Sequence, residues 1–404
     1  DPIEALRGVN RSTNRTGSLP RKTLVVFQAA LSLVLLSASG LLTAVLRNLE
    51  HQDFGFERDR RIVADMNPRI AGYRADQLPT LYRRIRESIG SVSSVSSVAL
   101  CQYSPQKGGG WGSGVWVDGH PAPGPKDENF AAWDRVTAGY FDVIGTPVTR
   151  GRGILEQDVA ASRQVAVVNE AFARKFFKDE DPIGRHFGRE PGQSRQFEVV
   201  GVTKDARYLT INLDKPIVPM FFLPEAQAEY ARGNQGSLFL NDIVIVTRPG
   251  AILSSGQVRR AMASVDPNLP IISIRTLTEQ VAGQFTQQRL IARLTSFFGI
   301  LSLVLASIGL YGVTAYNAER RTNEIVGLVL RGAFTLIVIG LLLGVPLSLA
   351  AGRFLGHQLY GMSPYDPVVT LTAVLALGLS ALIASLIPAL RASFISPLEA
   401  LRAE

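Results

Sequence analysis

The fold is decided by the stretch TLVVFQAALSLVLLSASGLLTAVL, which runs from Thr23 to Leu46 between Lys22 and Arg47. This stretch contains no charged residue. A bilayer core about 30 Å thick is crossed by roughly 20 mostly apolar residues in an α-helix, so the stretch is long enough to span a membrane. A cleaved signal peptide is the alternative, since basic residues precede the stretch and SASG offers small residues. The apolar part is too long for a typical signal peptide, which favours a retained anchor.

Three further apolar stretches lie in the C-terminal third of the chain. Residues 294–318, 332–352 and 367–390 are uncharged, and charged residues flank each of them. A core helix of a soluble protein rarely runs so far without a charge, so all three are predicted to cross the membrane. Composition agrees, because 46% of the residues are hydrophobic and only 19% are charged, against about 25% charged residues in typical soluble domains.

Basic residues in the short segments set the orientation of the four predicted spans. Lysines and arginines precede the first span, lie between the second and third, and follow the fourth, whereas the third-to-fourth loop carries only Arg353. Both termini and the second-to-third loop are therefore expected on the cytoplasmic side. The long stretch between the first and second spans is expected outside, because long domains are translocated largely regardless of their own charge.

These observations predict a membrane protein with four transmembrane α-helices in a 1 + 3 arrangement and a large α+β extracytoplasmic domain between helix 1 and helix 2. The predicted ranges are a cytoplasmic linker at 1–22, spans at 23–47, 291–318, 332–353 and 367–390, an external domain at 48–290, a cytoplasmic loop at 319–331, an external loop at 354–366 and a cytoplasmic tail at 391–404.

Small residues recur on one face of the second span and in the third. Gly299, Ser302, Ala306 and Gly309 are spaced by three to four residues, and Gly340 and Gly344 form a G-x-x-x-G pair. Such faces let helix backbones approach closely, so these six residues are candidates for helix packing or dimerisation. No charged residue lies inside the uncharged stretches 23–46, 294–318, 332–352 and 367–390. Proton relays and ion sites normally require one, which disfavours a conventional secondary transporter.

The external domain alternates strand-like and helix-like signals. Residues 163–177 predict a strand, a helix cap at Asn169 and an amphipathic helix, and 197–207 and 241–250 predict two further strands. Residues 77–92 and 256–270 predict helices with basic outer faces. The glycine-rich 108–114 is not followed by Gly-Lys-Ser/Thr, so it is no P-loop, and a flexible loop is expected there.

The sequence offers no catalytic or metal-binding constellation. Cys101 is the single cysteine and the four histidines are scattered, which disfavours a disulfide framework or a metal cluster. Neither a Gly-x-Ser-x-Gly elbow nor a carboxylate pair stands out. No cofactor is expected, and no nucleic-acid-binding signature accompanies the net charge of +8. The chain is therefore not expected to be an enzyme, and a tethered extracytoplasmic enzyme has no supporting residues.

At this point several stretches become recognisable. Residues 136–158, 165–187, 197–207 and 287–325 and the closing SPLEALRAE resemble MacB/FtsX-type ABC transporter permeases, in the same order and over nearly the whole chain. The chain looks most like the C-terminal module of an acidobacterial duplicated orphan permease, in which two such modules run in tandem.

The resemblance implies a permease subunit of an ATP-driven efflux or mechanotransmission complex. Its implied partners are a cytoplasmic ABC ATPase subunit, a second permease module as a dimer or tandem partner, a periplasmic adaptor and the lipid bilayer. It also implies the bacterial inner (plasma) membrane, with the large domain in the periplasm. ATP hydrolysis would belong to the partner. The alternative is an uncoupled, membrane-anchored periplasmic binding or scaffold module, and the transported substrate is not disclosed.

One departure from the family favours that alternative. In the family an Arg-Arg-x-x-Glu-Ile motif continues into a short cytoplasmic helix that docks on the ATPase. Here Arg320, Arg321 and Glu324 match the motif, but residues 326–331 already lead into the third span, and about a dozen family residues are missing. These three residues are the candidates for ATPase contact, and the shortened loop puts the coupling in question.

The two ends of the chain resemble each other. Residues 1–7 read DPIEALR and residues 396–402 read SPLEALR. Chance similarity between two ordinary helix starts is one reading. Because SPLEALR is the family's cytoplasmic exit from the fourth span, the sequence favours the other reading, that Asp1 lies where a preceding permease module ended.

Overall fold

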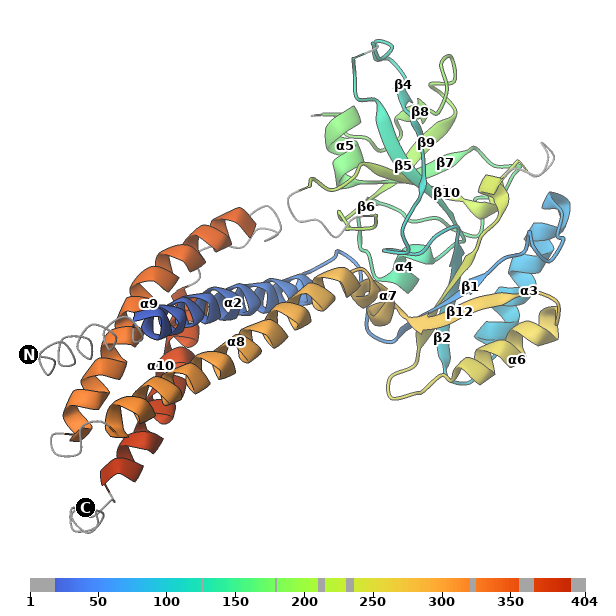
Figure 1. The fold of residues 1–404 in the computed structure, drawn as a ribbon. Coiled ribbons are helices and arrows are strands. Elements are labelled where there is room, and N and C mark those ends of the chain that lie inside the picture. The colour runs from blue at the N-terminus through green and yellow to red at the C-terminus, as the bar shows by residue number, and fades with distance from the viewer. Residues whose placement is uncertain are drawn as a thin grey trace, which may run out of the picture. The chain divides into compact units, whose positions relative to one another are not determined.

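A computed structural model describes residues 19–124, 126–178, 180–209, 215–229, 236–319, 325–355 and 367–393. The similar end segments, 1–7 and 396–402, lie outside these residues. The chain divides into two compact units (Figure 1). A helical unit contains the residues up to His51 and from Phe285 onward, and an external unit contains Gln52–Gln284.

The helical unit consists of long helices. They are α2 (Leu19–His51), α8 (Thr286–Glu319), α9 (Ile325–Leu355) and α10 (Pro367–Ser393). Each is long and apolar enough to cross a membrane, over Thr23–Asn48, Thr286–Ala315, Phe334–Arg353 and Pro367–Pro388 respectively. With the α+β unit inserted between α2 and α8, this confirms the fold class predicted from the sequence.

The helices extend beyond the apolar stretches that predicted them. Most notably, α9 begins at Ile325, inside the range expected to be a cytoplasmic loop. An α-helix satisfies its own backbone hydrogen bonds, so it can continue where the apolar sequence stops. Helix α8 likewise begins at Thr286, before the predicted start of the second span.

The external unit is built on one mixed sheet. Among the described residues, ten strands run in the order β12 (Ile271–Thr276), β1 (Arg61–Met66), β11 (Asp242–Thr247), β2 (Val95–Cys101), β5 (Phe130–Val136), β10 (Met220–Pro224), β7 (Val165–Asn169), β9 (Phe197–Thr203), β8 (His186–Gly188) and β4 (Trp116–Val117). Two more strands lie off this path: β3 (Trp111–Gly114) pairs with β5, and β6 (Val148–Gly151) pairs with β9.

Short helices complete the external unit. They are α3 (Leu78–Gly90), α4 (Tyr140–Ile144), α5 (Glu170–Phe176), α6 (Ser255–Val265) and α7 (Leu277–Gly283), with single 3₁₀ turns at Ala75–Gln77, Glu225–Gln227 and Gly236–Leu238. Helices α3 and α6 lie side by side (Figure 1), and the Ser88 hydroxyl donates to the Ala261 carbonyl across them.

Two separate hydrophobic cores divide the external unit into lobes. In the first lobe, α3 and α6 pack on β12, β1, β11 and β2, and Ile85, Ile245 and Val258 are fully buried. In the second lobe, α5 packs on the remaining strands around an aromatic cluster. The ring centroid of Phe187 lies 5.0 Å from that of Phe172 and 5.1 Å from that of Phe221. Between β2 and β5, the lobes share the single residue pair Cys101–Val136.

Local predictions for the external unit mostly agree with the structure. Asn169 ends β7 and caps α5, because its side chain accepts from the backbone N–H of Phe172. The expectation of a loop at 108–114 is wrong in part, since Trp111–Gly114 forms β3. A Cβ atom at Gly112 would come within 1.9 Å of the Phe130 ring. Glycine at this position therefore leaves room for the Phe130 ring.

Candidate functional site

The predicted helix-packing residues of α8 face α2. The Ser302 hydroxyl lies 2.8 Å from the Ser32 hydroxyl, and both residues are buried. A Cβ atom at Gly299 would lie 3.3 Å from the Leu36 side chain, and one at Gly309 would lie 2.9 Å from Oε1 of Gln28. Ala306 is also buried. The small side chains thus let the α8 backbone approach α2 closely.

The G-x-x-x-G pair of α9 faces the same helix. A Cβ atom would come within 2.8 Å of the Ala29 Cβ if placed on Gly340, and within 2.9 Å of Leu33 if placed on Gly344. Helix α2 therefore packs against both α8 and α9, and it is the central helix of the unit. The sequence left open whether these small residues serve packing within the chain or dimerisation. In the structure their neighbours belong to helix α2 of the same chain.

A small cavity lies among the four helices. It measures about 20 Å³ and is lined by Val25, Ala29, Ala306, Leu310, Leu377 and Ala381 among others. A cavity of this size holds about one water molecule, so it offers no binding site for a solute. In the first turn of α8, Arg289 forms an ion pair with Glu50 of α2, and the shortest N–O distance is 2.5 Å.

The predicted ATPase-contact residues Arg320, Arg321 and Glu324 lie outside the described residues. Their flanks are described, since α8 ends at Glu319 and α9 begins at Ile325. Five residues, 320–324, separate these two helices in the sequence, and the shortened coupling segment stays a prediction.

A buried polar cluster surrounds the place where the two lobes meet. Asp134 of β5 is fully buried, and its carboxylate accepts hydrogen bonds from the backbone N–H groups of Gln102 and Arg135 and from the Tyr208 hydroxyl. Burial raises the pKa of the Asp134 carboxyl well above its usual value, against the lowering effect of these three hydrogen bonds. The Tyr208 hydroxyl also contacts the Tyr140 hydroxyl.

A charged trio lies on the first-lobe side of this cluster. The Lys107 ammonium donates to Asp242 at 2.6 Å and lies 3.0 Å from Asp65. Asp242 is fully buried and also accepts from the Ser104 N–H at 2.6 Å. Burial raises the pKa of Asp242 even though Lys107 opposes the shift. The pKa of Lys107 is itself raised, because the two carboxylates outweigh its desolvation. We call the buried polar cluster around Asp134, together with the charged trio of Lys107, Asp65 and Asp242, the inter-lobe junction.

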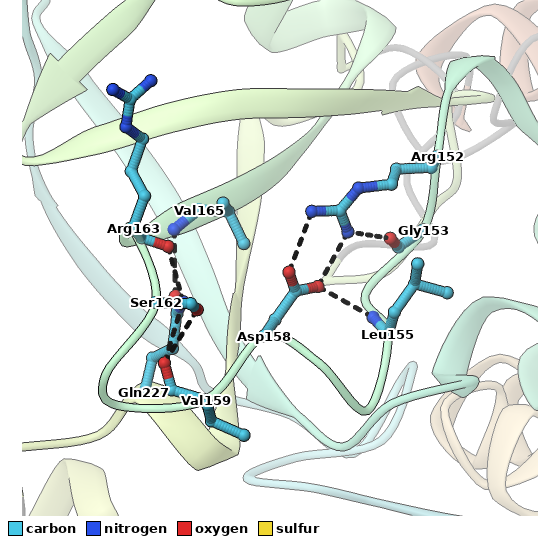
Figure 2. A network of polar contacts seen from close by, with 9 residues as sticks. All are labelled: Arg152, Gly153, Leu155, Asp158, Val159, Ser162, Arg163, Val165 and Gln227. Atoms are coloured by element: carbon cyan, nitrogen blue, oxygen red, sulfur yellow. Dashed lines mark hydrogen bonds and ion pairs between the residues drawn. The ribbon is translucent and has the colours of Figure 1, made fainter.

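A second polar network pins the loop between β6 and β7 (Figure 2). Arg152 binds Asp158 through two hydrogen bonds of 2.8 Å, and Asp158 also accepts from the Leu155 N–H. Gln227 accepts from the Val165 N–H and donates to the Ser162 hydroxyl. Asp158 is only 3% exposed, so this loop is held from inside the second lobe.

Neither network was found from the sequence. Their members are spread from Asp65 to Asp242, and no local motif marks them. The one available signal is the charged pair Asp134-Arg135 within the otherwise apolar strand FAAWDRV. In the described part of the chain, no group of three His, Cys, Asp or Glu residues is placed to hold a metal ion.

The family model for the MacB-like periplasmic core domain matches residues 28–265, more than half of the chain. The chain belongs to this family. The recognition of a MacB/FtsX-type ABC transporter permease from the sequence is thereby confirmed. The match begins inside α2 and ends with α6, so it includes most of the first membrane helix and the external unit up to α6, without β12 and α7.

Curated relatives agree with the family. The macrolide export ATP-binding/permease protein MacB 1/2 of Paracoccus denitrificans is 25% identical over 65% of this chain and 40% of its own length. MacB of Neisseria meningitidis is 27% identical over 65% of this chain and 42% of its own length. An uncharacterized ABC transporter permease of Bacillus subtilis, YvrN, is 24% identical over 66% of this chain and 68% of its own length. This MacB-like chain thus spans less than half of the MacB proteins that it matches.

Solved structures also resemble the MacB-like domain. The periplasmic region of MacB from Actinobacillus actinomycetemcomitans is 16% identical, with a TM-score of 0.37, over 57% of this chain and 94% of that one. The extracellular domain of the ABC-type transporter YknZ is 14% identical, with a TM-score of 0.32, over 48% of this chain and 87% of that one.

Proposed function

We propose that the chain is the permease subunit of an ATP-driven efflux or mechanotransmission complex. In this proposal a separate cytoplasmic ABC ATPase hydrolyses ATP, and the four helices convey the resulting movement to the MacB-like domain in the periplasm. The observation that carries the proposal is the family match over residues 28–265, within a chain with four membrane-type helices. The protein lies in the bacterial inner membrane.

The packing of the helical unit supports movement of whole helices rather than passage of a solute between them. Helix α2 is packed against both α8 and α9, and the cavity among the helices measures only about 20 Å³. The apolar stretches of the predicted spans, 23–46, 294–318, 332–352 and 367–390, carry no charged residue that would bind an ion or a charged substrate. The working unit contains a second permease module, and a periplasmic adaptor binds the external domain.

Coupling to the ATPase is assigned to Arg320, Arg321 and Glu324, which lie between α8 and α9. Charged residues at this position would contact the ATPase surface and transfer its movement directly to two membrane helices. The short connection between α8 and α9 favours a second candidate function. In that alternative the chain is an uncoupled periplasmic binding or scaffold module, anchored in the membrane and independent of ATP.

Reconstitution separates the two functions. The full chain is purified from its native membrane and tested for copurification with a P-loop ATPase, then for stimulation of that ATPase in proteoliposomes. The permease function predicts both, with loss of stimulation in an Arg320→Ala, Arg321→Ala double variant. Absence of an associated ATPase, with no gain when the missing coupling segment is inserted after Glu324, would favour the scaffold function.

A further inference from the structure

The backbone passes from the first lobe to the second through residues 101–107, which we call the crossover segment. It starts at the last residue of β2 and leads toward β3. Both sides of the inter-lobe junction hold it. Asp134 of the second lobe accepts from the Gln102 N–H at 3.1 Å, and Asp242 of the first lobe accepts from the Ser104 N–H at 2.6 Å. A shift of this segment would therefore alter contacts in both lobes.

Helix α7 supplies a third set of contacts to the crossover segment. The side-chain amide of Gln280 donates to the Ser104 hydroxyl at 2.7 Å and to the Pro105 carbonyl at 2.8 Å. The side-chain amide of Gln284, one turn later, donates to the Gln106 carbonyl at 2.6 Å. Gln280 is 3% exposed. Three consecutive residues of the crossover segment are thus bound by Gln280 of α7 and by Gln284, which follows the last residue of that helix.

In the sequence, α7 is followed at once by the helix α8, which contains a predicted membrane span. α7 ends at Gly283 and α8 begins at Thr286, so few residues separate the glutamines from a predicted membrane span. α7 is also firmly held in the external unit, since Leu277 and Val281 are buried and Thr276 caps the helix through the Glu279 N–H.

We propose that Gln280 and Gln284 are positioning residues, through which movement of the membrane helix α8 reaches the crossover segment and changes the angle between the two lobes. This inference rests on the proposed function for the source of the movement. A purely structural role for the glutamines would hold the crossover segment in place without making it respond to changes in α8. A transmitting role makes the crossover segment respond to changes in α8, and only while the glutamines are present.

The test is a double-mutant cycle on the full chain in lipid nanodiscs, read by hydrogen exchange with mass spectrometry. Arg289→Ala perturbs the start of α8 by removing its ion pair with Glu50. Gln280→Met with Gln284→Met removes the amide donors at nearly constant side-chain length. Gln157→Met, at an exposed loop position with no side-chain hydrogen bond among the described residues, is the matched control.

We expect Arg289→Ala to raise the hydrogen-exchange rate of the backbone amides in residues 101–107 about fivefold. This increase corresponds to the loss of about one hydrogen bond. In the Gln280→Met, Gln284→Met background, Arg289→Ala should cause no further change, whereas in the Gln157→Met background its full effect should remain. Strictly additive effects, or no response to Arg289→Ala in the parent, would overturn the proposal.

Two features keep the result interpretable. Gln284 is exposed, so the Gln284→Met single variant provides a folded protein if the double variant fails to fold, and it should reduce the coupling in part. If Arg289→Ala still had its full effect on residues 101–107 in that variant, residues other than Gln284 would transmit the movement. The experiment also needs no ATPase. Failure of ATPase stimulation would therefore count against the proposed function without deciding whether the two glutamines transmit movement of α8.

Discussion

The Tyr208 hydroxyl donates a 2.8 Å hydrogen bond to Oδ2 of Asp134, a carboxylate that is fully buried and has no salt bridge within the described part of the chain. Asp134 belongs to β5, while Tyr208 follows β9 and its hydroxyl oxygen also lies 3.0 Å from the Tyr103 carbonyl oxygen of the crossover segment. This pair therefore ties three distant parts of the sequence together at the inter-lobe junction. Four predictions follow from this and related contacts.

Asp134→Asn should change how stability depends on pH. Because burial raises the pKa of Asp134 in the folded state, the folded protein binds this proton more tightly than the unfolded chain does. The resulting stabilisation is complete below the unfolded pKa of about 4 and is lost as the pH rises through the folded value. The wild type should therefore lose stability relative to Asp134→Asn with increasing pH.

Tryptophan fluorescence during thermal unfolding of the full chain in detergent measures this difference. The three tryptophans, Trp111, Trp116 and Trp133, all lie in the external unit, so the signal reports on the correct unit. Parallel Tm profiles of the two proteins between pH 4 and pH 8 would show that Asp134 has no raised pKa.

Lys107→Met should destabilise the external unit by about 3 kcal/mol, because it leaves the buried carboxylate of Asp242 without its cation. Adding Asp242→Asn should recover part of this loss, since the unpaired charge is then removed. Arg74→Met is the matched control. Its partner Asp76 is exposed, so this substitution should leave unfolding unchanged. Equal losses from Lys107→Met and Arg74→Met in denaturant melts would contradict the assignment.

Gly299→Leu should separate α8 from α2. The added side chain would meet the Leu36 backbone N, which already lies 3.4 Å from an ideal Cβ atom at this glycine. Gly312→Leu, on the same helix, is the control, because an added Cβ atom meets nothing within 4 Å there. Disulfide formation between Ser32→Cys and Ser302→Cys measures the approach of the two helices. The yield of this disulfide should fall severalfold with Gly299→Leu and stay unchanged with Gly312→Leu. Comparable crosslinking in both variants would refute close packing at Gly299.

Asp158→Ala should release the pinned loop between β6 and β7. The substitution removes both hydrogen bonds to Arg152 and the one to the Leu155 N–H, with a cost of about 2 kcal/mol. Hydrogen exchange of residues 152–163 should rise while that of β9 stays unchanged. Glu156→Ala removes only an exposed ion pair with Arg86 and should leave the loop protected. Unaltered exchange in Asp158→Ala would mean that Gln227 holds the loop by itself.

The membrane helices and many local elements of the external unit could be predicted because their causes are local. An uncharged run of more than 20 residues must be a helix in a bilayer, since no water is present to satisfy its backbone. Asn169 marks a helix start through its own side chain. The strand at Trp111–Gly114 was missed, because its pairing partner β5 and the rings that need its glycines lie further along the chain.

The sequence by itself determined the membrane topology, the α+β class of the external unit and the family, because these depend on hydrophobic periodicity, charge and motif order. Only the tertiary structure decided that α2 is the central helix and that Asp134, Asp242 and Lys107 gather where the lobes meet. It also decided that Gln280 and Gln284 hold the crossover segment. The physical reason is that such contacts join residues far apart in the sequence, 270 positions for Ser32 and Ser302 and 178 positions for Gln106 and Gln284, and their geometry exists only once the chain has folded.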